Sequence, residues 1–237
     1  MPHFSRTAVL LIAMAPALVS AEDFIYENYT VDGTASIITP DTLTVTDTFQ
    51  IGDTVSSTFV GSDTSAYKIV LGNVALPSIS GHFDSSRWLQ ANTMVLHNES
   101  TYRAFPHTVD IGSLILNDSS IWRASANGGS PVSINELTLN GDAWFGSIST
   151  QTTIGQATVN GGRLSFDSGH TFVETINVNS GRLSSASNID ISDRIVLSSG
   201  TSFWFATGRA SSGGLIDNSG EVRLFLSSVG SVFHNRI

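Results

Sequence analysis

A short motif that recurs after nineteen residues constrains this chain more than any other feature of its sequence. "TVNGGRLS" from Thr158 is followed by "NVNSGRLS" from Asn177, and similar segments such as "ELTLNGDAWF" from Glu136 and "RIVLSSGTSFWF" from Arg194 flank them. Each copy has an apolar–x–apolar run, usually two or three residues drawn from Asn, Gly, Asp and Ser, and a second short alternating run. Repetition at about twenty residues indicates a solenoid, in which one unit cannot bury its apolar face alone.

The second apolar residue of each first run is the expected inward anchor of its coil. Successive anchors are about 19–26 residues apart: Val45, Leu71, Leu96, Leu116, Leu139, Val159, Val178, Leu197 and, in a weaker last copy, Val222. Backbone N–H and C=O groups of one coil would pair with the next coil about 4.8 Å away. We therefore predict an all-β parallel β-solenoid (β-helix). In it Val159 lies beside Val178 and Leu164 beside Leu183, while Thr158 and Asn177 point outward.

Composition supports strands and narrows the classes of partner. Only 13 % of the residues are charged, one is lysine and none is cysteine, whereas globular domains carry about 25 % charged residues. Loss of Arg6 with a cleaved leader would leave ten basic residues against twenty acidic ones, a net charge of −10. Such a surface disfavours nucleic acid and anionic lipid as partners, and it leaves glycans and proteins as candidates.

The chain divides into three expected segments. Residues 1–21 read as a secretory signal peptide, because a short n-region with Arg6 precedes a largely apolar run that ends on small residues. Residues 22–90 are expected to hold an N-terminal cap and irregular first coils, since only "KIVLGNVAL" fits the repeat between Val55 and Trp88. Residues 91–237 are the expected solenoid repeats. The sequence thus predicts a secreted or cell-surface protein whose mature chain does not span a membrane.

The segments "LTLNGDAWF", "ATVNGGRLSF" and "INVNSGRLSS" resemble the passenger regions of bacterial autotransporters. The resemblance covers roughly Leu114 to Leu226 and implies a right-handed β-helix on the cell surface that acts in adhesion, aggregation or host contact. No translocator barrel follows the repeats, so we expect the chain to be part of a longer polypeptide. "IDNSGEVRLFL" from Ile216 is similar to the N-terminal domains of fungal hyphally regulated cell-wall adhesins, which implies the same fold.

Many β-solenoids are enzymes that act on polysaccharides, so the carboxylates are the candidate catalytic residues. Glycoside hydrolysis needs two carboxyl groups about 5–9.5 Å apart. Asp190 and Asp193 lie close in "IDISDR", and Asp167 and His170 lie one coil earlier. The competing interpretation is that acidic residues at solenoid corners cap turns. Because nothing else repeats this cluster, we expect no catalytic activity. The sequence holds no cofactor motif and its histidines lack metal-ligand spacing, so we expect no cofactor and no metal site, with a weak Ca²⁺ site at Asp118 beside Asn117 as the alternative.

Aromatic residues recur just after the turns, at Tyr102, Trp122, Trp144, Phe145, Phe166 and in "FWF" from Phe203. An internal aromatic column is expected rather than an exposed stripe, because burial stabilises large rings more than solvent contact. Alternation places Trp204 outside, which makes it the candidate contact residue for a ligand. The sequence predicts a non-catalytic adhesion or surface-display module for a host or cell-surface glycan or protein. A carbohydrate-active hydrolase or lyase is the alternative.

Overall fold

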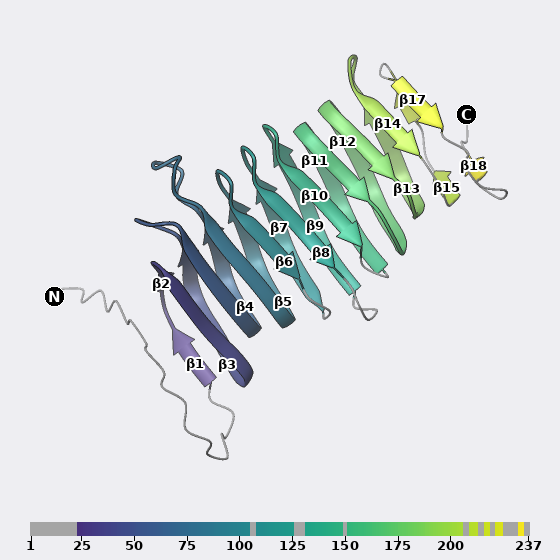
Figure 1. The fold of residues 1–237 in the computed structure, drawn as a ribbon. Helices are drawn as coiled ribbons and strands as arrows, with labels where there is room; N and C mark the ends of the chain where they lie inside the picture. The colour runs from purple at the N-terminus through teal and green to yellow at the C-terminus, as the bar shows by residue number, and fades with distance from the viewer. Residues whose placement is uncertain are drawn as a thin grey trace.

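The chain folds as an all-β parallel β-solenoid of about eight turns, which confirms the predicted fold class. The computed structural model describes residues 23–104, 108–125, 131–148, 151–205, 209–212, 216–218, 221–224 and 232–234. Figure 1 shows the coils stacked along one axis from the purple N-terminal end to the yellow C-terminal end. Within the described residues, no helix has the length and apolar character needed to cross a membrane. The predicted signal peptide lies outside the described residues.

The described strands join through parallel pairings, apart from one isolated antiparallel bridge in a loop. In chain order they are β1 (Asp23–Tyr26), β2 (Tyr29–Val31), β3 (Thr34–Ile51), β4 (Ser57–Leu71), β5 (Gly81–Leu96), β6 (Thr101–Ala104), β7 (Val109–Leu116), β8 (Ile121–Ser125), β9 (Pro131–Asn140), β10 (Trp144–Ile148), β11 (Gln151–Phe166), β12 (His170–Ser185), β13 (Asn188–Leu197), β14 (Ser202–Phe205), β15 (Arg209–Ser212), β16 (Ile216–Asn218), β17 (Glu221–Leu224) and β18 (Val232–His234).

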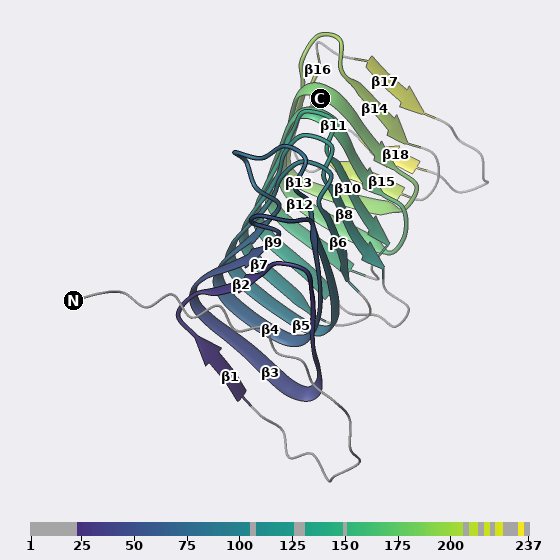
Figure 2. The ribbon, with the colours of Figure 1, turned by 60° about the vertical axis from the view of Figure 1, so that its left-hand side comes forward.

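Each coil has three faces, because the longest strands bend at their corners and continue. In β11, residues 151–154 and their register partners form face 1, residues 156–160 form face 2, and residues 163–166 form face 3. Shorter strands such as β6, β8, β10, β14 and β17 contribute to face 3 alone, and Figure 2 shows them following one another along one side. Bends thus divide each coil into three short runs with alternating side chains.

The register predicted from the repeated motif is confirmed. Val159 pairs with Val178, and Leu164 pairs with Leu183. All four side chains are completely buried. Thr158 and the residue beside it, Asn177, are half-exposed on the outer side of face 2. The two copies are therefore successive coils that bury the same columns.

Two of the nine expected anchors are wrong. Val45 pairs with Ala66 on face 1, whereas the face 2 partner of Leu71 is Ile51. "TLTVTDTFQI" contains two apolar–x–apolar runs, and only the second lies on face 2. Val222 pairs with Phe203 on face 3, and the backbone partner of Leu197 is Asn218. With Ile51 as anchor, the longest expected coil shortens to twenty residues.

The expected cap and irregular coils over residues 22–90 need a similar correction. Strands β3, β4 and β5 pair along all three faces, so regular coils begin well before residue 91. The additional residues form one lateral loop at 73–80, which Asn98 holds by donating from Nδ2 to the carbonyls of Asn73 (3.0 Å) and Ile79 (2.8 Å). The repeat is hard to see here because Phe59 and Phe83 are the only large inward side chains of their face 3 strands.

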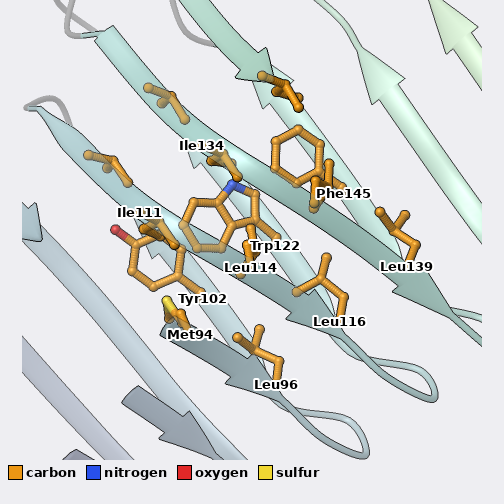
Figure 3. Close-up of a cluster of buried hydrophobic side chains, with 14 of the residues drawn as sticks. Met94, Leu96, Tyr102, Ile111, Leu114, Leu116, Trp122, Ile134, Leu139 and Phe145 are labelled. Carbon is orange, nitrogen blue, oxygen red and sulfur yellow. The ribbon is translucent and has the colours of Figure 1, made fainter. Parts of the chain in front are cut away.

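The predicted internal aromatic column is confirmed except at Trp144, which points outward beside the inward Phe145 and is half-exposed. Figure 3 shows the middle section of the column. Tyr102, Trp122 and Phe145 are completely buried, with ring centroids 4.1 Å and 6.0 Å apart in stacked geometry. Leu96, Leu116 and Leu139 form a parallel column inside face 2. Phe49, Phe59 and Phe83 extend the aromatic packing toward the N-terminal end with centroid distances of 4.9 and 5.4 Å. Burial of rings of this size contributes more than any other side-chain type to such a core.

The asparagines of the repeated motif do more than occupy turns, because their side chains form a hydrogen-bonded ladder on the outside of the solenoid. Each side-chain Nδ2 donates to the Oδ1 of the previous coil, from Asn140 to Asn117 (2.9 Å), Asn160 to Asn140 (3.0 Å) and Asn179 to Asn160 (2.8 Å). Because each amide carries both a donor and an acceptor, the ladder can continue from coil to coil. This ladder fixes the register on the outside of the corner as the apolar columns do inside.

His97 lies at one end of the asparagine ladder, and we expect it to make the stability of the fold sensitive to acid. Its Nδ1 lies 3.4 Å from Nδ2 of Asn117. Burial lowers the pKa of His97 from 6.5, Asp118 opposes this shift and Lys68 adds to it. The unfolded chain therefore binds a proton more readily than the folded chain. The contribution of neutral His97 to the free energy of unfolding should be fully present above pH 6.5 and should be lost as the pH drops through 6.5 toward the lower folded-state pKa.

Urea unfolding between pH 7.5 and pH 5 tests this contribution of His97. The variant His97→Asn extends the ladder with a group that does not titrate, and we expect its midpoint to decline less over this range than that of the wild type. An identical decline in both proteins would show that other groups cause the acid sensitivity.

Candidate functional site

The predicted carboxylate cluster divides into separate local pairs. His170 Nε2 lies 2.6 Å from Oδ2 of Asp190 across strands β12 and β13. The imidazole also stacks on Phe172, with ring centroids 4.2 Å apart and an interplanar angle of 23°. These three side chains lie on the outer side of face 1, where alternation points Thr171 and Val173 inward. Of the predicted residues, only His170 and Asp190 come together.

Asp167 and Asp193 have other partners. Asp167 accepts a hydrogen bond from the hydroxyl of Ser165 (2.6 Å) at the end of a face 3 strand. Asp193 accepts one from Thr175 (3.0 Å) and lies 3.7 Å from the guanidinium of Arg194. These contacts are the turn and surface roles that the competing sequence interpretation expected for corner carboxylates.

Two further candidates of the sequence do not add to this cluster. The side chain of Trp204 lies outside the described residues, so the predicted ligand contact there stays a prediction. Asp118 accepts a hydrogen bond from the backbone N–H of Asn98 (3.2 Å) and has a positive φ of 58°. In the part of the chain that the structure describes, no three His, Asp or Glu side chains gather as they would around a metal ion.

A shallow open groove runs along the solenoid at the bend between face 1 and face 2. It consists of three consecutive hollows of about 490, 490 and 570 Å³. The first and second hollows share Asn135, and the second and third share Gly155 and Glu174. From Tyr67 to Glu174 the groove crosses five inter-coil steps, about 24 Å at 4.8 Å for each step.

An exposed aromatic ring lies toward each end of this groove. Tyr67 is 59 % exposed in the first hollow, and Phe172 is 39 % exposed in the third. Between them the lining is polar, with amide, hydroxyl and carboxylate side chains that include Gln90, Asn92, Asn135, Gln156, Glu136 and Glu174. Among the described residues that line the groove, none is Lys or Arg. Ring faces combined with amides and carboxylates suit a ligand with many hydroxyl groups.

Glycines hold the floor of the groove close to the previous coil. A Cβ atom at Gly112 would lie 2.6 Å from the carbonyl oxygen of Asn92, and one at Gly155 would lie 2.6 Å from that of Asn135. A side chain at either position would therefore push the coils apart. The bend needs glycine for packing, and the same glycines leave the groove open between the amide side chains.

Sequence reasoning missed Tyr67, Phe172 and Glu174, which the structure places in this groove. Phe172 could have been found, because the inward Thr171 and Val173 in "HTFVET" force the ring between them outward. Tyr67 and Glu174 occupy bend positions. A pattern of alternating residues does not show which way a bend side chain points.

Comparisons of this chain with protein-family models, curated proteins and solved structures found no match.

Proposed function

We propose that this protein is a non-catalytic, exported adhesion module that binds a linear glycan of low negative charge along the groove between face 1 and face 2. The observation that carries the proposal is the placement of Tyr67 and Phe172 toward opposite ends of one groove whose middle section presents amides, hydroxyls and carboxylates. Sugar rings stack on aromatic faces, and their hydroxyl groups exchange hydrogen bonds with amides and carboxylates.

Three features support export and display. The leader-like first 21 residues and the complete lack of cysteine suit a chain that crosses a membrane unfolded, as does the resemblance of its repeats to autotransporter passengers. Parallel pairing from coil to coil gives an elongated scaffold that presents long faces to a partner. The carboxylates that line the groove disfavour anionic ligands at this site.

Binding to neutral linear polysaccharides tests this function. Isothermal titration with soluble β-1,3- and β-1,4-glucans as probes should show binding that weakens about tenfold in Phe172→Ala, because a ring contact is lost. Trp88→Ala is the matched control, since Trp88 is an exposed aromatic residue on face 1 that does not line the groove. No binding to either glucan, or equal losses in both variants, would contradict the proposal.

A carbohydrate-active enzyme is the second candidate, and the groove itself favours it. Asp190 and Glu174 both line the third hollow, and Asp190 contacts His170. Two carboxyl groups beside a bound sugar chain are the minimum for glycoside hydrolysis. If the wild type releases reducing ends from the bound glucan and Asp190→Asn or Glu174→Gln stops the release, the protein is an enzyme and the non-catalytic proposal is wrong.

A further inference from the structure

Face 3 carries a concentration of arginine in a chain that is acidic overall. Arg103 on β6, Arg123 on β8, Arg163 on β11 and Arg182 on β12 all project from the outer side of this face, and Trp144 on β10 lies between them. These five residues are called the arginine strip below. The chain has only eleven Lys and Arg residues against twenty Asp and Glu. Four arginines on one side of five adjacent strands are therefore a strong local excess of positive charge.

The register sets like charges side by side within the strip. Arg103 pairs directly with Arg123, and Arg163 pairs directly with Arg182. Like charges at directly opposed positions of neighbouring strands destabilise a sheet. The other outward positions on these strands, from Thr101 to Ser184, hold no carboxylate: Thr101, Ile121, Gly146, Ser165 and Ser184. Stability of the fold alone does not account for this arrangement.

A carboxylate borders the strip at its N-terminal end. Asp84 on β5 pairs in register with Arg103. Its Oδ1 lies 3.1 Å from Nε2 of His82, so the carboxylate contacts a residue of its own strand. A second carboxylate, Asp167, borders the strip at the end of β11, where it accepts a hydrogen bond from Ser165.

Two arginines elsewhere in the described chain contact carboxylates. Arg87 lies 3.5 Å from Asp63, and Arg194 lies 3.7 Å from Asp193. Within the residues that the structure describes, Arg103, Arg123 and Arg163 form no such salt bridge. The guanidinium of Arg163 is positioned by two hydroxyls instead, through Nη2 to Ser165 and Nε to Ser184, both at 3.3 Å. The Ser165 hydroxyl in turn donates to Asp167, so this carboxylate reaches Arg163 only through a hydroxyl and forms no direct salt bridge with it.

Trp144 lies along the face rather than projecting from it. A Cβ atom at Gly146 would come within 2.9 Å of the indole ring, so the glycine provides the space in which the ring lies. The guanidinium carbon of Arg123 is 6.0 Å from the ring centroid. The indole Nε1 is buried and has no hydrogen-bond partner. The outcome is a half-exposed aromatic platform between arginines.

We propose that the arginine strip binds an acidic polysaccharide that carries carboxylate groups along its chain. Guanidinium groups pair with carboxylates through two parallel hydrogen bonds, and an indole face stacks on a sugar ring. Arg103 and Arg123 lie on adjacent coils, as do Arg163 and Arg182, at about 4.8 Å for each pair. Two inter-coil steps and two residues along the strand separate the pairs, with the strand of Trp144 between them. A linear polymer that crosses these strands at a slant can therefore contact both pairs. A single-stranded nucleic acid fits less well, because it stacks successive bases on several aromatic rings and the described strip has one.

This site is distinct from the groove in residues, face and charge. The groove lies between faces 1 and 2 and is lined by carboxylates, whereas the strip lies on face 3 and is cationic. Loss of one site therefore leaves the other in place, and either proposal can fail alone.

Polygalacturonate and its fully methyl-esterified form are the matched probes, because they share a backbone and differ in charge. We expect the wild type to bind polygalacturonate, to bind the ester at least tenfold more weakly, and to lose affinity as salt is raised. The double variant Arg123→Gln/Arg163→Gln should bind polygalacturonate about a hundredfold more weakly, at roughly tenfold for each lost charge-assisted contact. Trp144→Ala should also bind more weakly.

The control variant Arg87→Gln/Arg194→Gln removes the same charge outside the strip and should keep wild-type affinity for polygalacturonate. Far-UV circular dichroism should be the same for all variants, since the substituted arginines are exposed. If both double variants lose the same affinity for polygalacturonate, the effect depends only on the net charge of the protein and the proposal is wrong. Stronger binding of oligothymidylate than of polygalacturonate, or salt-sensitive self-association that Arg123→Gln/Arg163→Gln abolishes, would assign the strip to nucleic acid or to a second copy of the chain.

Discussion

Replacement of Val159 by Asp should lower the free energy of unfolding by several kcal/mol and unravel the neighbouring coils. Val159 is completely buried between Leu139 and Val178. A carboxylate there would have no partner, and removal of a charge from water without compensation costs about 3–5 kcal/mol in proteins. Because each coil is stabilised mainly by its neighbours, the damage should spread along the solenoid.

Urea unfolding followed by far-UV circular dichroism measures this effect, with Thr158→Asp as the matched control. Thr158 is the preceding residue of the same strand and points outward, so the same carboxylate remains hydrated and should change stability by less than about 0.5 kcal/mol. Limited proteolysis should cut Val159→Asp near β9, β11 and β12 before other regions. Equal destabilisation by the two substitutions would mean that the alternation within face 2 is wrong.

Gly162→Ala should produce the second largest effect, at roughly 3 kcal/mol. Gly162 has a positive φ of 70°, and a Cβ atom there would lie 1.9 Å from the carbonyl oxygen of Ala143. Such a contact with backbone cannot be relieved by a side-chain rotation, so the corner has to move, and overpacking of this kind costs about 1–3 kcal/mol in addition to the left-handed backbone.

Gly200→Ala separates the two causes. Gly200 has a similar φ of 83°, but no atom lies within 4 Å of the position that a Cβ would take there. Only the backbone preference is lost, so the cost should be about 1 kcal/mol. Thermal unfolding of both variants checks the comparison. If Gly162→Ala is no more destabilising than Gly200→Ala, the second glycine of "NGGR" serves conformation alone and does not allow close approach of the coils.

The fold could be predicted from the sequence because the same apolar residues alternate along each strand and recur about every twenty residues. Val159 and Leu164 recur as Val178 and Leu183, so the buried columns and their register are visible in the printed sequence. The first coils were harder, since Phe59 and Phe83 are the only large inward residues of the face 3 segments of β4 and β5, which are otherwise rich in Ser, Thr, Gly and Asp. A single large ring fills the interior of such a segment, so the segment shows no alternating apolar pattern in the sequence.

The candidate sites could be predicted only in part. The pairing of His170 with Asp190 depends on adjacent coils at the same phase, which the repeat supplies. The groove depends on bend residues such as Tyr67 and Glu174. Neither helix nor strand periodicity predicts whether the side chain of a bend residue points inward or outward. The arginine strip depends on the register of five strands, so Arg103 and Arg182 become parts of one surface only after the coils are stacked.

Affinity as a function of glycan length tests most directly whether a linear chain lies along the groove between faces 1 and 2. Titration with neutral β-glucan oligosaccharides of increasing length should show affinity that rises with each added sugar until the ligand reaches from Phe172 to Tyr67, about 24 Å. Tyr67→Ala should weaken the long ligands and leave the short ones unchanged if these bind at Phe172. Affinity that is already maximal for a disaccharide, or a Tyr67→Ala loss that is independent of length, would contradict the account.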